Sequence, residues 1–342
     1  MKQSFKIITV CLLLANSTNL FAQNKTFTRD YTYQASEIDS KVSSRTNATT
    51  EMRNILLREV GTYMRTEQIV ITSGSTQEYK EKIEAITAGV VEMKILDEKW
   101  NGETYWIKAE MTINPKEVEQ KIKEIAEDKQ KVKELEESRA RVKAAEEENA
   151  RLRKEIAELN KKQGNEQKIE QKTNDYNKQI NTLSAEEYYT KGLNARSKGD
   201  NTQAIEYYKQ AINLNPNHAN AQCNLGFMYG EGKGVIQDYY EAVKWYRKSA
   251  EQGNAQGQYN LGVMYENGYG VTQDYYEAVK WYRKSAEQGD ANGQYGLGVM
   301  YFHGYGGLPQ SKSQAIEWFK KAAKQGNETA INYLKGRGIT SY

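Results

Sequence analysis

The sequence predicts a mainly α-helical protein: a C-terminal α-solenoid of helix-turn-helix repeats, a long central helix or coiled coil, and a small N-terminal α+β domain. Three observations support this fold class. A segment recurs three times at an offset of 36 residues, so that Leu225-Gly226 becomes Leu261-Gly262 and Leu297-Gly298. Residues 115–162 are about half charged, with both signs mixed. The mean hydropathy is −0.86 and only 3 of 342 residues are proline, which favours long solvated helices over a large sheet core.

The composition argues against several classes of function. With 2 His and 2 Cys, the chain is poorly supplied for a His/Cys metal centre or a disulfide framework. The net charge of +3 is small, and Lys and Arg alternate with Glu, which argues against nucleic-acid binding. The carboxylates belong to no catalytic motif. We therefore predict a protein that is not an enzyme and binds no cofactor.

The N-terminus has the pattern of a signal peptide. Residues 1–22 carry Lys2 and Lys6 near the start, continue with the apolar run Ile7–Leu14 and end at Ala22, where cleavage is expected. The apolar run is too short for a membrane span, and the residues before Cys11 match a lipidation site poorly. No later stretch is apolar enough to span a bilayer. The expected location is therefore periplasmic or extracellular.

Residues 24–114 mix helix and strand patterns. A helical spacing runs from Thr50 to Met64, a strand-like run covers Glu67–Thr72, and a helical composition covers Glu78–Ala88. Two alternating runs then flank Asn101-Gly102, which is a strong signal for a β-hairpin. These patterns predict a small α+β domain with a C-terminal hairpin. Two helices and a terminal hairpin weakly resemble the small domains of bacterial envelope and flagellar-assembly lipoproteins, which implies a binding or assembly role.

Residues 115–162 predict one long helix. Pro115 suits the first helical position, and apolar residues follow at spacings of mostly three and four, as in a coiled coil. Asn149 falls on the apolar seam, where a buried Asn can fix the register of a parallel dimer. Two interpretations stay open: a homodimer or trimer through residues 115–162, or a single solvated helix held by ion pairs. Both make the helix a spacer, followed by a polar linker at residues 163–183.

The C-terminal half divides into repeats. The three copies cover residues 219–254, 255–290 and 291–327, and each reads as a helix, a glycine-rich turn and a second helix. A glycine in the first helix (Gly226, Gly262, Gly298) allows a neighbouring helix to approach closely. Asp238 and Asp274 are expected to cap the second helices. Since no unit can bury its apolar stripe alone, the units should stack, with residues 328–342 as a capping helix and tail.

These residues resemble two related families. The strings L-G-x-M-Y, G-x-G-V and E-A-V-K-W-Y-R-K-S-A-E-Q-G resemble Sel1-like repeats. Residues 184–217 resemble one tetratricopeptide repeat, with matches at the signature positions Tyr188, Gly192, Ala204, Tyr208, Ala211 and Pro216. The resemblance implies a non-catalytic scaffold or adaptor that binds a protein or peptide partner.

In tetratricopeptide-like solenoids the first helices line the concave face. Carried onto this chain, that implies three rows of partner-binding residues: Tyr189, Cys223, Tyr259 and Tyr295; then Leu193, Phe227, Val263 and Val299; then Glu231, Asn267 and His303. The third row differs between copies that are otherwise nearly identical, as a groove for one particular ligand would. The tyrosine and aliphatic rows suit an extended peptide or an amphipathic helix. The alternative is that these tyrosine and aliphatic side chains belong to the core between helices.

Other motifs favour structure over chemistry. The run Gly230–Gly234 lacks the spacing of a phosphate-binding loop and recurs as a turn in each copy. Cys223 replaces a tyrosine of the other copies and is expected to be a packed thiol, although His218 is near in sequence. The equally placed Trp245, Trp281 and Trp318 are expected in the core. The competing hypothesis is a cell-envelope enzyme, or a protein that binds β-lactams or wall fragments, as linked to some Cys-rich Sel1-like proteins.

Overall fold

The structure is a computed structural model that describes residues 24–66, 91–118, 120, 129–161 and 166–341. The expected signal peptide and the patterns at Glu67–Thr72 and Glu78–Ala88 lie outside the described residues. The chain forms two compact units. One holds most of a three-stranded sheet and its helix, and the other holds residues 33–50, 101–105 and the chain from residue 137 onward. Among the described residues, no helix is long and apolar enough to cross a membrane.

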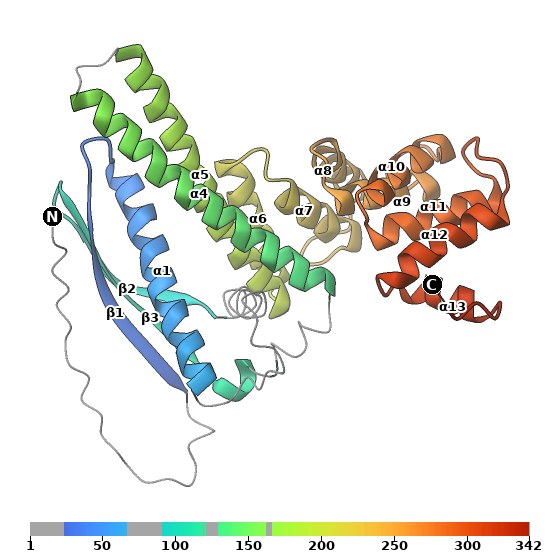
Figure 1. Cartoon of the computed structure of the whole chain (residues 1–342), viewed down its shortest axis with the longest axis horizontal. Coiled ribbons are helices and arrows are strands. Elements are labelled where there is room, and N and C mark those ends of the chain that lie inside the picture. Colours follow the sequence, from blue (N-terminus) through green and yellow to red (C-terminus); the bar gives the residue numbers. More distant parts are fainter. Residues whose placement is uncertain (1–23, 67–90, 119, 121–128, 162–165, 342) are drawn as a thin grey trace, which may run out of the picture. The chain divides into compact units, whose positions relative to one another are not determined.

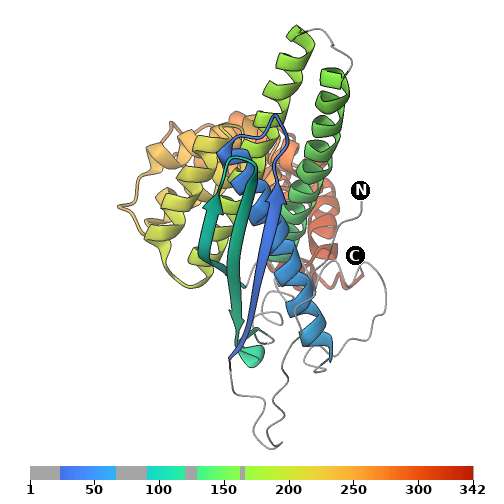
Figure 2. The ribbon, with the colours of Figure 1, turned by 90° about the vertical axis from the view of Figure 1, so that its left-hand side faces the viewer.

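The first unit is a sheet covered by a helix on one face (Figures 1 and 2). Its strands are β1 (Lys25–Gln34), β2 (Met93–Trp100) and β3 (Thr104–Ile113), in the order β1-β3-β2. Helix α1 (Lys41–Thr66) buries residues four apart, and β3 buries alternate residues, as their periods require. The buried hydrophobic residues of α1 and β3 in this unit are Met52, Leu56, Leu57, Val60, Met64, Ile107, Ala109, Met111 and Ile113.

The predicted hairpin is confirmed, and the sheet has a further strand. Gly102 has a φ of +99°, and the Asn101 side chain accepts hydrogen bonds from the backbone N–H groups of Glu103 and Thr104. Sequence analysis missed β1, whose residues alternate less clearly because most of them are exposed. Thr26 bonds Thr112, and Ala35 bonds Glu103. In both pairs the two residue numbers add up to 138. A constant sum means that one strand ascends while the other descends, so β1 runs antiparallel to β3.

The predicted polar linker at residues 163–183 is wrong. Residues 166–183 begin α5 (Glu166–Ser197), and Tyr176, Ile180 and Leu183 are buried in it. Their spacing of four and three was too sparse among polar residues to be recognised as a helix face. Helix α4 (Lys129–Lys161) lies beside α5 (Figure 1), and Leu152 and Ile156 share a hydrophobic cluster with Tyr176 and Ile180.

The apolar seam of α4 is therefore filled within the chain. Ala145, Asn149, Leu152 and Ile156 are all at most 5% exposed. Residues 115–118 are helical, and the seam positions Ile122 and Ile125 lie outside the described residues. A dimer or trimer through residues 115–162 would have to use other positions than these four, and α4 packs against its neighbour instead of standing alone as a spacer.

A buried carboxylate joins residues 33–50 to this helix pair. Asp39 has a fully buried side chain whose Oδ2 lies 3.2 Å from Nη2 of Arg153 in α4. It also accepts hydrogen bonds from the hydroxyls of Tyr176, Tyr33 and Ser43. Desolvation raises its pKa, but the hydrogen bonds and the Arg153 charge outweigh that effect and leave the pKa below its usual value of 3.8.

The repeats form four helical hairpins. The tetratricopeptide-like unit consists of the end of α5 and α6 (Asn201–Leu214). The three copies are α7 (Ala219–Glu231) with α8 (Tyr239–Glu251), α9 (Ala255–Asn267) with α10 (Tyr275–Glu287), and α11 (Ala291–His303) with α12 (Lys312–Lys324). Helix α13 (Glu328–Lys335) follows, where a capping helix was predicted.

Within each hairpin an aromatic ring covers a glycine of the first helix. A Cβ on Gly226 would fall 2.8 Å from the Tyr246 ring, and a Cβ on Gly262 would fall 2.6 Å from the Tyr282 ring. Gly192 and Gly298 have the same relation to Tyr208 and Phe319. Real Cβ atoms do not tolerate such distances, so glycine is required for the two helices to pack this closely.

Capping and turn residues follow the predictions. Asp238 and Asp274 cap α8 and α10. The turns contain Gly232 and Gly268, which end the first helices at φ values of +63° and +70°. The tryptophans lie further out than predicted: Trp281 is 5% exposed, but Trp245 and Trp318 are half-buried, each with a lysine over the ring.

Glutamines couple one repeat to the next. Gln252 donates to Oε1 of Gln222 (2.6 Å), and Gln222 donates to the carbonyl of Pro216 in the preceding unit (2.6 Å). The same pair recurs as Gln288 with Gln258 (2.7 Å). Since Gln258 donates to the Ala250 carbonyl, the relay crosses each boundary at an equivalent place. These bonds fix the rotation between neighbours, which a purely apolar contact would leave looser.

We predict that Gly226→Ala destabilises the repeats by about 1–3 kcal/mol, because the new methyl group overlaps the Tyr246 ring. Gly230→Ala on the same helix is the matched control, since its Cβ would meet the Ala242 methyl at an ordinary 3.5 Å. Helix propensity alone makes the control neutral or more stable, by up to about 1 kcal/mol. Urea unfolding followed by circular dichroism measures both variants, and equal effects would contradict the packing account.

We also predict that acid destabilises the second unit. The folded-state pKa of Asp39 is lowered, so its ionisation contributes stability above the unfolded pKa near 3.8 and loses it as the pH falls through the folded pKa. The free energy of unfolding should therefore fall as the pH decreases below about 5. Asp39→Asn should flatten this dependence in urea titrations at several pH values. An unchanged slope would contradict the ionised state of Asp39.

Candidate binding surface

The first helices of the repeats lie on the inner side of the row of hairpins. Contacts join each second helix to the first helix of its own unit and of the next unit, as α8 joins α7 and α9. Direct contacts also join α7 to α9 and α9 to α11. The elements that approach one another most closely lie on the inside of a curve. We call the solvent-facing side of α5 (from residue 184), α7, α9 and α11 the first-helix surface.

The first predicted row is exposed only in the later repeats. Tyr259 and Tyr295 are half-buried, and their rings pack at 5.7 and 5.4 Å from Tyr282 and Phe319. Tyr189 and Cys223 are 1% and 6% exposed, so neither is accessible to a partner in this structure.

The other two rows are more accessible. Leu193 is buried, whereas Phe227, Val263 and Val299 are half-buried. The third row is exposed: Glu231, Asn267 and His303 all end their helices at the surface. His303 stacks on Tyr305 at 5.1 Å. The structure therefore brings together a strip on α9 and α11, formed by Tyr259, Val263, Asn267, Tyr295, Val299 and His303, which we call the open strip. Its tyrosines and valines are partly exposed and also pack against the hydrophobic core of the last repeats.

Sequence reasoning missed the amides and acids on the same surface. Gln256 and Asn260 on α9 bond each other at 3.1 Å, and Asn292 occupies the Gln256 position in the next repeat. Glu266 accepts a hydrogen bond from the Tyr282 hydroxyl. Burial raises the pKa of Tyr259 and of Tyr295, and the nearby Glu266 carboxylate adds to the effect in both. The strip thus combines aromatic rings, paired amides and a negative charge, and offset comparison of the copies alone would have found the amide row.

A pocket of about 520 Å³ opens at the N-terminal end of this surface. It lies between α4, α5, the first residues of α7 and the turn before α9, and its lining includes Arg141, Glu186, His218, Asn220 and Asn254. Glu186 is 2% exposed. Burial acts to raise its pKa, but His218 and Arg141 outweigh that effect and hold the pKa below its usual 4.5.

His218 has a structural role and does not activate a thiol. Its Nδ1 accepts from the backbone N–H of Ala221 at 3.2 Å, which caps α7. Its Nε2 therefore carries the proton and lies 3.3 Å from Glu186. Cys223 is instead approached by the Asn260 amide at 3.7 Å. In the described part of the chain, no three His, Cys, Asp or Glu side chains are grouped as a metal ion would require.

Comparison with known proteins agrees with the repeat architecture. The Sel1 repeat model matches residues 219–254, 255–290 and 291–327, and a TPR repeat model matches residues 192–231. The tetratricopeptide match thus begins inside the predicted unit and extends through α7. Among curated proteins, an uncharacterized protein of Methanocaldococcus jannaschii is 46% identical over 44 residues, which is 13% of this chain and 51% of that protein.

Three solved structures are similar over the repeats. A Sel1 repeat protein from Oxalobacter formigenes is 32% identical and covers 48% of this chain and 66% of its own, with a TM-score of 0.42. The uropathogenic Escherichia coli antigen c5321 is 37% identical and covers 52% and 37%, with a TM-score of 0.40. Helicobacter pylori cysteine rich protein B is 29% identical and covers 40% and 95%, with a TM-score of 0.32. The C-terminal units of this chain are Sel1 repeats that follow a tetratricopeptide-like repeat.

Proposed function

We propose that this protein is an exported, non-catalytic scaffold whose first-helix surface binds a protein or peptide partner. The single observation that carries the proposal is the open strip on α9 and α11. Its side chains vary between copies in the third row, where Asn267 and His303 replace Glu231, although α8 and α10 repeat letter for letter.

The chemistry of the strip suits a polypeptide. Tyr259 and Tyr295 offer large rigid apolar area that loses little conformational entropy on binding. Gln256 and Asn292 carry amides, which can donate to and accept from a peptide backbone at the same time. Sel1 and tetratricopeptide repeats are typically protein-interaction modules, which agrees with this assignment. The two lysines and the apolar run of residues 1–22 support export.

We predict that Tyr259→Ala combined with Tyr295→Ala abolishes partner capture. The full-length chain serves as bait in envelope extract of the source organism, with cross-linking and mass spectrometry as readout. Removing both rings takes away the largest apolar contacts of the strip, and hot-spot side chains of this kind cost at least ten-fold in affinity.

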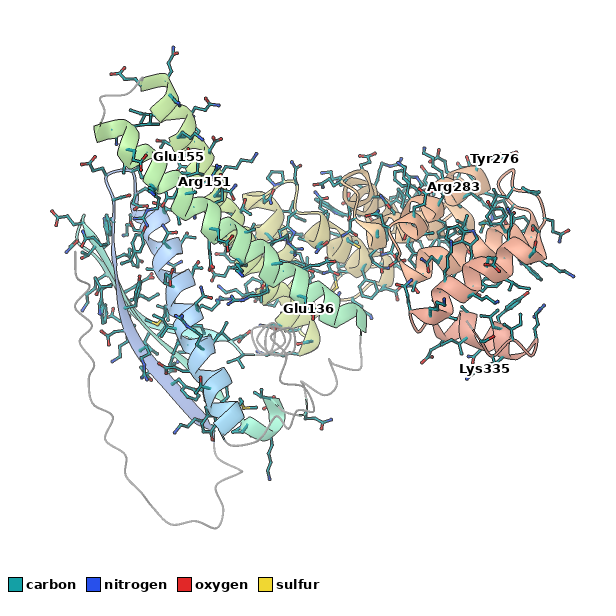
Figure 3. The ribbon with its side chains drawn as sticks, viewed as in Figure 1. Glu136, Arg151, Glu155, Tyr276, Arg283 and Lys335 are labelled. Carbon is teal, nitrogen blue, oxygen red and sulfur yellow. The ribbon has the colours of Figure 1, made fainter. Side chains whose placement is uncertain are left out.

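The matched control is Tyr240→Ala combined with Tyr276→Ala. These tyrosines are 78% and 72% exposed at the start of the second helices (Tyr276 is labelled in Figure 3), away from the strip. The control should capture the partner as the unmodified chain does. Asn267→Arg, which changes an exposed residue, tests the strip without touching the core. A partner lost in the control and retained in both strip variants would contradict the proposal.

A further inference from the structure

Helix α4 covers part of the first-helix surface. One residue of each first helix lies three positions before the first predicted row: Glu186, Asn220, Gln256 and Asn292. Two of these four, Glu186 and Asn220, are contacted by Arg141 of α4. Their equivalents in the later repeats, Gln256 and Asn292, are half-buried: Gln256 donates to Asn260, and Asn292 accepts from the Asn327 amide at 3.0 Å.

Arg141 is held in a notch made of three chemically different groups. Its Nε bonds Oε1 of Glu186 at 2.5 Å, and its Nη2 bonds Oε2 at 3.3 Å. Its guanidinium lies 5.8 Å from the centre of the Tyr189 ring. Its two terminal nitrogens each lie 3.2 Å from the Asn220 amide. A carboxylate, an aromatic face and an amide all bind a planar guanidinium. Together they favour arginine over any other side chain at this place.

The remaining contacts complete the notch. Ser138, one turn before Arg141 on α4, donates to Glu186 at 3.1 Å, and His218 faces the same carboxylate. Glu186 is thus a buried charge whose bonds come from α4 and from the cap of α7. A carboxylate buried on a binding surface costs free energy unless a cation meets it, so this notch is built for a positively charged helix.

We propose that this notch is a receptor for an arginine-bearing helix, that α4 is its resident ligand within the chain, and that an external helix with arginine at the Arg141 position competes with α4 for it. The occupant follows from the seated helix itself and from charge complementarity at Glu186. The pocket of about 520 Å³ beside Arg141 extends to Asn254, the residue before α9, and leaves room for a ligand to continue toward the open strip. This inference shares one assumption with the proposed function, namely that the first helices form a binding surface.

The test uses a fluorescent synthetic peptide of residues 137–150 and the full-length chain. Wild-type protein should bind it weakly, because a tethered ligand acts at an effective concentration of about 1 mM. The Arg141→Ala protein should bind at least about ten-fold more tightly, since its own helix has lost the guanidinium. Arg151→Ala is the matched control: Arg151 lies on the same helix, is paired only with Glu148 and Glu155 in the ion pairs observed (Figure 3), and should behave as wild type.

Peptide variants identify the recognised group. An Arg141→Ala peptide should lose binding to the Arg141→Ala protein, whereas an Arg139→Ala peptide should retain it. Glu186→Gln added to the Arg141→Ala protein should also abolish binding. Circular dichroism verifies folding, and Arg141→Gln replaces Arg141→Ala if the latter does not fold.

Three results would overturn the proposal. The first is no binding of the peptide, up to about 1 mM, to the Arg141→Ala or Arg141→Gln protein. The others are equal affinity of the peptide for the wild-type and the Arg141→Ala protein, or binding that survives the Glu186→Gln substitution. The Tyr259→Ala, Tyr295→Ala combination should leave peptide binding unchanged when added to the Arg141→Ala protein. Failure of partner capture and failure of the notch are thus distinguishable.

Discussion

The contact between an aromatic ring and a glycine inside each helical hairpin is the constraint on which the rest of the second unit depends. Gly192, Gly226, Gly262 and Gly298 each face a tyrosine or phenylalanine of the paired helix, at distances that exclude any side chain. Because the ring fills the space of the missing side chain, the two helices of each unit pack at a similar separation in all four units. Equal hairpins can then stack in a row and present their first helices on one side.

The hydrogen bonds of Gln222 and Gln258 to the preceding units fix how neighbouring units are oriented in this stack. An apolar interface tolerates small rotations, but a donor such as Gln258 must reach the carbonyl of Ala250 in the preceding unit. The surface that results has an aromatic and aliphatic strip in the later repeats and a charged notch in the first. The notch depends on one substitution at a repeat-equivalent position: Glu186 stands where the later units have amides.

The repeats could be predicted from the sequence because their determinants are local and recur. Gly232 and Asp238 each act within a few residues of their own position, Gly262 packs against Tyr282 of the same helical hairpin, and three copies make the pattern unmistakable. The β-hairpin was predictable for the same reason, since Asn101 and Gly102 define it alone. Exposure of Asn267 and His303 at the helix ends also followed from repeat position.

What the sequence did not reveal depends on contacts between distant segments. Strand β1 is defined by pairing with β3, whose register joins residues such as Thr26 and Thr112, 86 positions apart. The apolar seam of α4 looked like an interface between chains, because nothing in the sequence indicates that Tyr176 and Ile180 of α5 cover it. Tyr189 likewise packs against Arg141, which lies 48 positions earlier in the chain, as well as against the rings of His218 and Tyr208.

The central claim is that the first helices form the binding surface. Hydrogen exchange of the full-length chain, with and without the captured partner, tests it most directly. The account predicts slower exchange in residues 255–267 and 291–303 when the partner is bound, and little change in residues 275–287 and 312–324. Protection confined to those second helices, or to residues 25–113, would contradict it.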